Sequence, residues 1–138
     1  MLRADLTTQK AKAETYPDDF ALQFMGGRGY AAKILWDEVP AGADPLSAKN
    51  KFIVAAGPLS GLAVPNAGKR VVAAKSPLTG GYGDGNLGTN MALQLRNAGF
   101  DLLIVEGKAA KPTYLLLEDK KVSFRNAEAL WGLGTLET

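Results

Sequence analysis

Residues 101–126, DLLIVEGKAAKPTYLLLEDKKVSFRN, decide the fold class. This segment holds three short apolar runs separated by glycine, proline and charged residues, which is the pattern of β-strands and turns. The expected strands are DLLIVEG (101–107), TYLLLED (113–119) and KVSFRN (121–126). The last two are joined at Asp119-Lys120, so they are expected to form a hairpin.

Upstream of this segment the pattern alternates between helix and strand. Met91, Leu93 and Leu95 indicate a helix that Gly99 closes. The valine-rich runs KFIVAA (51–56) and VVAA (71–74) are better strands than helices.

The N-terminal part predicts a hairpin followed by two helices. LRADL (2–6) and KAKAETY (10–16) flank a short turn, and Pro17-Asp18-Asp19 supplies the start of a helix that Gly26-Gly27 stops. A second helix is expected over about residues 29–38, and AEALWGLGTLET (127–138) reads as the start of another. The whole pattern indicates one α+β domain over residues 1–138.

Composition excludes several functions for this chain alone. It has 138 residues, 46% of them hydrophobic, which suits one compact core. Without cysteine or histidine it offers no disulfide, no thiolate ligands for an iron–sulfur cluster and no ordinary zinc site. No apolar run reaches the roughly 18–20 residues of a membrane span, so a cytoplasmic protein without membrane contact is expected. The net charge of +2 gives no argument for nucleic acid.

The charges are unevenly distributed along the sequence. From Pro45 to Gly83 there is no acidic residue, whereas basic residues occur throughout: Lys49, Lys51, Lys69, Arg70 and Lys75. Two interpretations are open at this point. The segment is either an ordinary solvated face or a surface that favours an anion.

Two glycine clusters are candidates for binding an anion. GGRG (26–29) and GDGNLGTN (83–90) each precede an expected helix, where free backbone N–H groups bind phosphates. Neither cluster has the spacing of a phosphate-binding P-loop, and glycine-rich segments are often only turns. Asn86 and Asn90 then serve as helix caps, and Arg28 is either a surface residue or a clamp on a phosphate.

Several sequence blocks together resemble the N-terminal domain of the tungsten-containing aldehyde ferredoxin oxidoreductase family. The blocks are LRADLTT (2–8), GGRGYAAKIL (26–35), DPLSAKNK (44–51), AAGPLSG (55–61), KSPLTGG (75–81) and NAGFDLLIVEGKAAKP (97–112). The resemblance implies a base domain of two β-sheets with short helices. On this base would sit a bis-pterin cofactor, tungstopterin or molybdopterin, whose two phosphates are bridged by magnesium.

The same resemblance implies the site residues. Asn86 and Gly88 fall where the family uses a side-chain amide and backbone contacts at the metal–pterin site, and Leu87 and Thr89 belong to the same segment. A basic residue is expected before the KSPLTGG block. Counting back from Lys75 gives Lys69, but the family typically has arginine and Arg70 is adjacent, so both remain candidates.

The chain also departs from the family pattern. Family members carry a [4Fe–4S] cluster and further pterin-binding and substrate residues in later domains, so a truncated or split protein is expected, with those domains or a separate subunit as its partner. Uncovered sheet edges predict self-association as a homo-oligomer. Gln9 stands where the family commonly has a turn glycine.

The resemblance implies an enzyme that oxidises aldehydes to carboxylic acids and passes electrons through the cluster to ferredoxin. This chain would bind cofactor in it and be inactive alone. Two other functions remain open: a non-catalytic phosphate- or nucleotide-binding domain, and a structural subunit. The sequence does not distinguish tungsten from molybdenum. It does not select among aldehydes, glyceraldehyde 3-phosphate and aromatic acyl-CoA compounds as substrate either.

Overall fold

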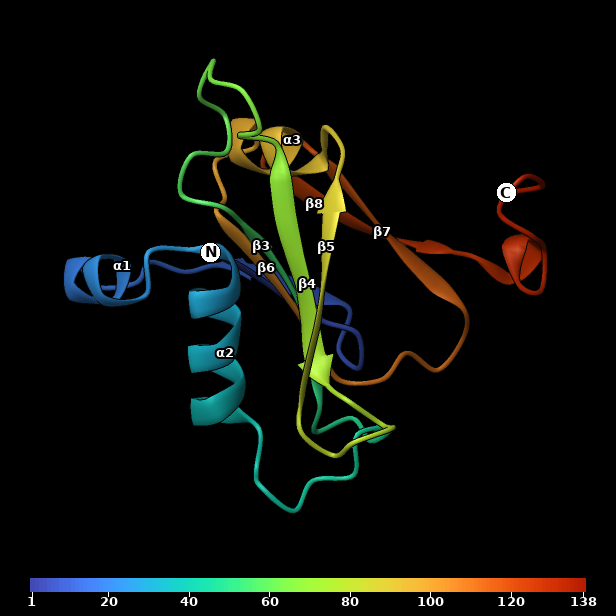
Figure 1. Ribbon diagram of the computed structural model, residues 1–138. Helices are drawn as coiled ribbons and strands as arrows, with labels where there is room; N and C mark the ends of the chain where they lie inside the picture. Colours follow the sequence, from blue (N-terminus) through green and yellow to red (C-terminus); the bar gives the residue numbers. More distant parts are fainter.

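The computed structural model describes residues 1–138 and shows a mixed α+β fold with two β-sheets, which confirms the expected fold class (Figure 1). The strands are β1 (Leu2–Asp5), β2 (Lys10–Ala13), β3 (Lys51–Ala56), β4 (Lys69–Lys75), β5 (Tyr82–Gly88), β6 (Leu102–Glu106), β7 (Thr113–Glu118) and β8 (Lys121–Asn126). The helices are α1 (Asp18–Phe24), α2 (Gly27–Glu38) and α3 (Met91–Asn97), and a 3-10 turn, η1, covers Glu128–Leu130.

The larger sheet has six strands in the order β2-β1-β6-β3-β4-β5, and β7 pairs with β8 in a separate two-stranded sheet. Only the β1–β6 pair is parallel, with Leu2 opposite Leu103. Strands β6 and β3 lie at the centre, and their apolar sequences fit burial on both faces. Strand β5 is an edge strand, bonded only to β4.

Helix α2 covers one face of the larger sheet. Tyr30 and Ile34 of this helix pack against Ile53, Val71 and other buried residues of β3, β4 and β6. Helix α1 packs on the same side through an aromatic group that also involves α2: Tyr16, Phe20, Phe24 and Tyr30. The alternation of side chains along each strand therefore directs one apolar set toward α2.

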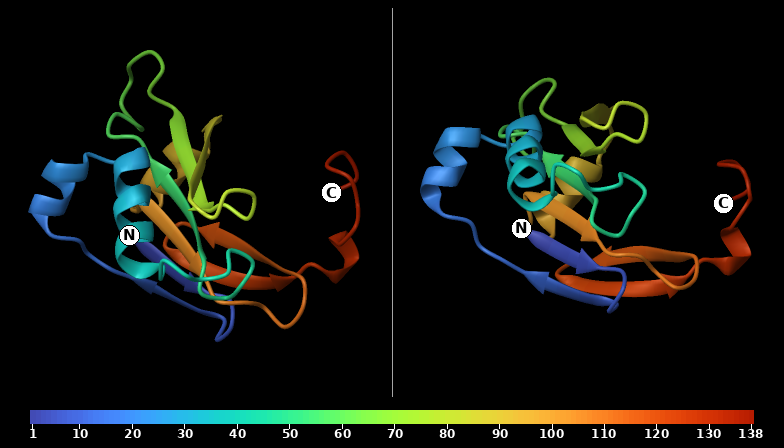
Figure 2. Two further views of the ribbon diagram at one scale, coloured as in Figure 1. Left: turned by 60° about the horizontal axis from the view of Figure 1, so that its bottom comes forward. Right: turned by 90° about the horizontal axis from the view of Figure 1, so that it is seen from below.

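The opposite face is covered by α3 and by the β7–β8 hairpin, as the two views in Figure 2 show. Leu95 of α3 and Phe100 pack with Leu2, while Leu117 and Val122 of the hairpin add partly buried surface. The larger sheet is thus the middle layer of the molecule. No helix in the structure is both long enough and apolar enough to cross a membrane.

Three predictions of element boundaries are corrected. Helix α2 begins at Gly27 rather than near residue 29, because Met25, Gly26 and Gly27 make the turn from α1 with positive φ angles. The expected C-terminal helix is only the 3-10 turn η1, since Gly132 adopts a φ of 88° soon after it. Strand β4 begins at Lys69, two residues before the expected start.

The largest correction concerns the glycine segment 83–90, which was expected to be a loop at a helix N-terminus. Residues 82–88 form strand β5, and the turn lies earlier, at residues 76–81, where the Ser76 N–H donates to the Gly81 carbonyl (2.8 Å). Pairing with β4 along seven residues outweighs the low strand propensity of the glycines. Asn86 is therefore not a helix cap, and Asn90, at the start of α3, makes no side-chain capping bond.

Candidate functional site

The β4–β5 hairpin brings the predicted site residues together at one edge of the sheet. Lys69 lies opposite Gly88, Arg70 opposite Leu87, and Val71 opposite Asn86. Thr89 follows directly, between β5 and α3. Residues 15 to 19 positions apart in sequence are therefore neighbours across a single antiparallel ladder.

The side chains of these residues divide between the two faces of the sheet. Asp84 bonds to Arg28 of α2, so the residues in step with Asp84, which are Asn86 and Gly88, lie on the α2 side. Lys69, opposite Gly88, shares that side. Arg70 and Leu87 lie on the α3 side. The two basic candidates thus serve different faces.

Arg70 and Lys69 also differ in their surroundings. The Arg70 residue is only 9% exposed, and its Nη1 group donates to the Thr89 hydroxyl. The Nε atom of Arg70 is buried without a hydrogen-bond partner, and no carboxylate pairs with this guanidinium. Lys69 is exposed and makes no side-chain hydrogen bond or ion pair. Neither cation has a counterion within the chain, but only Lys69 is exposed to solvent.

Two of the three glycines of β5, Gly85 and Gly88, are not required by the fold. Gly85 and Gly88 have ordinary φ angles, and a Cβ built on either would meet no atom within 4 Å. A glycine inside a strand weakens the strand and commonly marks a place where a ligand or another backbone comes close. These two positions leave open space on the two faces of the edge strand.

The glycines of the other cluster have a structural cause. Gly26 and Gly27 adopt φ angles of 125° and 50°, and a Cβ on Gly29 would lie 2.1 Å from the Phe24 carbonyl oxygen. The GGRG segment is thus explained by the tight turn between α1 and α2.

Arg28 is engaged by an acidic partner. Its guanidinium binds both carboxylate oxygens of Asp84, with Nη2···Oδ1 at 3.0 Å, and the Tyr82 hydroxyl donates to Asp84 Oδ2 at 3.0 Å. Hydrogen bonds from Arg28 lower the pKa of Asp84, and burial together with Asp84 raises the pKa of Tyr82 to about 12. Asp84 and Tyr82 were not predicted, because nothing local in the sequence indicates their contact with α2.

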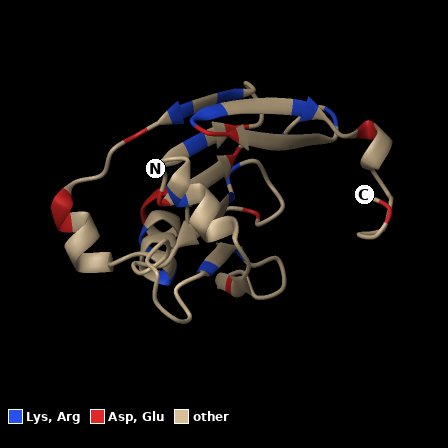
Figure 3. Ribbon diagram, turned by 90° about the horizontal axis from the view of Figure 1, so that it is seen from above, with Lys and Arg blue, Asp and Glu red and all other residues tan.

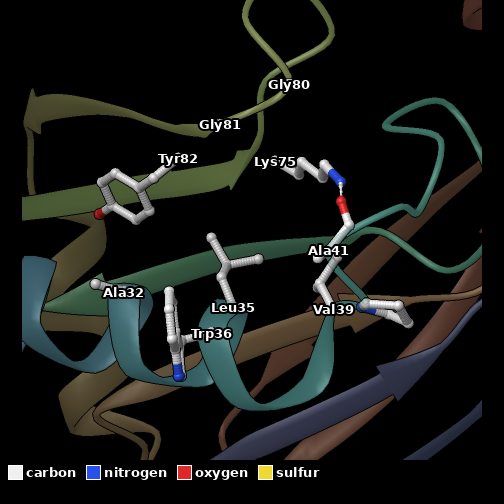
Figure 4. Close-up of a pocket in the computed structure, with 10 residues that line it drawn as sticks. Ala32, Leu35, Trp36, Val39, Ala41, Lys75, Gly80, Gly81 and Tyr82 are labelled. Carbon is white, nitrogen blue, oxygen red and sulfur yellow. Dashed lines mark hydrogen bonds between the residues drawn. The ribbon is translucent and has the colours of Figure 1, made fainter.

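A cavity of about 450 Å³ lies between α2 and the turn end of the β4–β5 hairpin (Figure 4). Leu35 and Trp36 of α2, with Val39 just after the helix, form one wall of the cavity, and Tyr82 with Gly80 and Gly81 forms the other. Lys75 lines it too, but its ammonium group donates to the Ala41 carbonyl. The cavity is largely apolar, contains no carboxylate and was not predicted from the sequence.

Charge around the site is mainly positive. Strands β4 and β5 carry the basic residues Lys69, Arg70 and Lys75 and one acidic residue, Asp84, whereas Lys51 of β3 is paired with Glu38 and Glu106. Figure 3 shows the positions of all Lys and Arg residues in blue and of all Asp and Glu residues in red. No group of three or more carboxylates lies close enough to hold a metal ion. The residues at this edge suit the anionic, organic part of a cofactor better than a metal ion itself.

Known proteins of one family are similar to this chain over its whole length. Residues 1–138 match the family described as aldehyde ferredoxin oxidoreductase, N-terminal domain. The tungsten-containing aldehyde ferredoxin oxidoreductase of Pyrococcus furiosus is 41% identical over 137 residues, which are 99% of this chain and 23% of the relative. From the same organism, the aliphatic sulfonate oxidoreductase, WOR-like subunit, is 36% identical over 140 residues, covering 99% of this chain and 22% of the relative.

A solved structure has the same fold. It is the active site complex BamBC of benzoyl coenzyme A reductase with 1,5-dienoyl-CoA, with a TM-score of 0.95 and 34% identity over 99% of this chain and 21% of that one. The chain therefore spans about a fifth to a quarter of these relatives. Because the family match runs from the first residue to the last, the chain belongs to the aldehyde ferredoxin oxidoreductase family, as its N-terminal domain.

Proposed function

We propose that this chain is the cofactor-binding base of a tungsten or molybdenum bis-pterin oxidoreductase, with the β4–β5 edge as the surface that receives the pterin. The observation that carries the proposal is the pair of open glycines, Gly85 and Gly88. Their backbone needs no glycine and their Cβ positions are empty, so the space suits a ligand that approaches the strand closely.

The residues at this edge fit the group that family membership implies. Gly88 gives access to the backbone, Asn86 offers a side-chain amide that can both donate and accept, and Lys69 offers an unpaired ammonium on the same face. Leu87 is partly exposed and adds apolar surface on the other face. When bound, the cofactor supplies the redox-active metal, while this chain holds and orients its organic part.

The activity of the whole enzyme rests on parts outside this chain. The relatives are about four times as long, and their names cover aldehyde and aliphatic sulfonate chemistry. Aldehyde oxidation with ferredoxin as electron acceptor is the reaction we propose. The iron–sulfur cluster and the substrate residues would come from the other domains or from a separate subunit, because this chain has no cysteine or histidine.

The test compares cofactor retention with stability in the assembled enzyme. Asn86→Ala and Gly88→Val should lower the tungsten or molybdenum content per enzyme, because they remove an amide partner and fill the approach to the backbone. The lost amide contact is expected to cost about 1–3 kcal/mol of cofactor binding. Melting curves of both variants should stay close to that of the unmodified protein.

Matched controls are available in the chain. Asn97 is exposed on α3 without a side-chain hydrogen bond, and Gly42 has no atom within 4 Å of its Cβ position. Asn97→Ala and Gly42→Val should retain the full metal content. Full metal content in both Asn86→Ala and Gly88→Val, with only the melting temperature changed, would contradict the proposal.

A further inference from the structure

The cavity between α2 and the turn end of the β4–β5 hairpin has an aromatic end and a cationic end, as Figure 4 shows. The rings of Trp36 and Tyr82 lie at one end, and the ammonium group of Lys75 lies at the other, beside the Ala41 carbonyl. The buried residue Leu35 lies between the two ends. The volume of about 450 Å³ falls within the range of small-molecule sites, about 300–1,000 Å³. A molecule that spans the cavity would therefore meet both aromatic surface and a positive charge.

The aromatic end is held in place but has no third ring to pack on. The Tyr82 hydroxyl donates to Asp84 at 3.0 Å, and Arg28 binds the same carboxylate, so the hydroxyl is engaged and the ring lines the cavity. Trp36 is 85% exposed, and neither ring is paired with another aromatic side chain. Aromatic rings pack favourably on one another, offset or edge to face. This end therefore suits an aromatic ring from outside the chain.

The cationic end has a fixed ammonium group without a counterion. Lys75 lies opposite Tyr82 in the β4–β5 ladder, and its ammonium group donates to the Ala41 carbonyl. No carboxylate lies within ion-pair distance of Lys75, and none lines the cavity. An ammonium group has three N–H donors, so two remain for a ligand. The lining therefore complements one anionic group.

We propose that this cavity binds a small aromatic carboxylate, with its ring against Trp36 and Tyr82 and its carboxylate on Lys75. One lysine balances one negative charge, which favours a carboxylate over a phosphate group of nearly two charges. The site lies at the turn end of the hairpin, whereas Lys69 pairs with Gly88 at the other end of the ladder, about 20 Å away along the strand. The inference is therefore independent of the proposed function.

The experiment titrates the 138-residue chain with 3-phenylpropionate, which carries a ring and a carboxylate on a flexible spacer. Two matched compounds keep one feature each: 3-phenyl-1-propanol has the ring without the charge, and propionate has the charge without the ring. Binding is followed by the broadening of the proton NMR lines of each compound, at constant ionic strength. The chain should bind 3-phenylpropionate at least roughly threefold more tightly than either matched compound, because the ring and the ion pair both contribute.

Substitution of Lys75 tests the cationic end. Lys75→Met should weaken the binding of 3-phenylpropionate by roughly threefold or more and leave that of 3-phenyl-1-propanol nearly unchanged, because only the carboxylate uses the ammonium group. Lys75→Arg keeps the charge, so it should bind 3-phenylpropionate more tightly than Lys75→Met does. Lys49→Met is the matched control, since Lys49 is exposed, has no ion pair and does not line the cavity. It should bind as the unmodified chain does.

Tryptophan fluorescence locates the ligand. The chain has two tryptophans, so Trp131→Phe leaves Trp36 as the only one. The emission of Trp36 should change in step with the NMR titration. Trp131 is also exposed but lies outside the cavity, so the emission of the Trp36→Phe chain should stay constant over the same titration.

Four results would overturn the inference. They are no binding of 3-phenylpropionate by the unmodified chain, equal affinity for 3-phenyl-1-propanol, unchanged affinity in Lys75→Met, and constant Trp36 emission during saturation. The first would leave the cavity to be covered by a segment of another polypeptide. The comparison of the two ring compounds needs no variant, so it decides the question even where Lys75→Met does not fold. None of these outcomes affects the metal-retention test of Asn86 and Gly88.

Discussion

Arg28 in the first turn of α2 holds Asp84 of the edge strand β5 through both carboxylate oxygens. This ion pair is the one side-chain hydrogen-bonded link between β5 and α2, because the other hydrogen bonds of β5 run to β4 or stay within the strand. Asp84 and Asn86 are two residues apart in β5, so their side chains lie on the same face of the sheet. The pair therefore fixes the position of the strand that carries the proposed pterin contacts.

Asp84→Asn should loosen β5 while the core stays intact. The Arg28 side chain is exposed and the pair lies at the edge of the sheet, so we expect little change in the midpoint of global unfolding but faster amide hydrogen exchange in residues 82–88. Asp37→Asn removes another exposed pair, Lys33–Asp37 on α2, and should leave exchange in β5 unchanged. Equal exchange in the unmodified chain and in Asp84→Asn would show that β4 alone holds the strand.

Acid should destabilise the fold through the carboxylates around Arg3. Burial favours the neutral form of Glu14 and Glu38, but hydrogen bonds from Arg3 outweigh it and lower the pKa of both groups. Because their folded pKa values lie below the unfolded ones, their contribution is present above the ordinary glutamate pKa and is lost as the pH falls through the folded values. Urea unfolding between pH 7 and pH 3 should show this loss. In Arg3→Met the unfolding free energy should depend less steeply on pH. An identical dependence in both proteins would show that Arg3 does not lower the pKa of Glu14 and Glu38.

Gln9→Gly should stabilise the protein. Gln9 adopts a φ of 52° in the turn between β1 and β2, a conformation that costs a residue with a Cβ roughly 1–2 kcal/mol. Glycine also raises the conformational entropy of the unfolded chain, which offsets part of this gain. Urea unfolding should therefore show an unfolding free energy about 1 kcal/mol higher than that of the unmodified chain. Lys10→Gly, in the neighbouring strand, should instead destabilise. A loss of stability in Gln9→Gly would count against the turn geometry.

Gly29→Ala should be strongly destabilising, unlike substitution of Gly85 or Gly88 in β5. The added Cβ would lie 2.1 Å from the Phe24 carbonyl oxygen, so the connection between α1 and α2 must move. We expect a loss of about 1–3 kcal/mol or more in unfolding free energy. Gly42→Ala, with no atom near its Cβ position, should change stability by less than about 0.5 kcal/mol. Similar values for the two variants would refute this account of the GGRG segment.

The strands with apolar runs could be predicted from sequence, and β5 could not. KFIVAA, DLLIVEG and TYLLLED are apolar enough to indicate buried strands by themselves. Strand β5 contains three glycines and an aspartate, and it is a strand because β4 pairs with it along its length. Its conformation therefore depends on tertiary pairing, which a local pattern does not reveal.

The candidate site was predictable in its residues but not in its geometry. Lys69, Arg70, Asn86 and Gly88 followed from family resemblance. Their division between two faces depends on β4 starting at Lys69, because a strand starting at Val71 leaves both cations in a loop. The Arg28–Asp84 contact joins residues 56 positions apart, and such long-range pairs leave no periodic signal in the sequence.

The parallel pairing of β1 with β6 has a consequence for the order of folding. Leu2 lies beside Leu103, about a hundred positions later in the sequence, so β1 has no neighbour but β2 until β6 has been made. The antiparallel β3–β4–β5 meander needs only nearby segments and closes short loops, so it can form first. We therefore expect the N-terminal hairpin to join the sheet last, after β6 has bonded to β3.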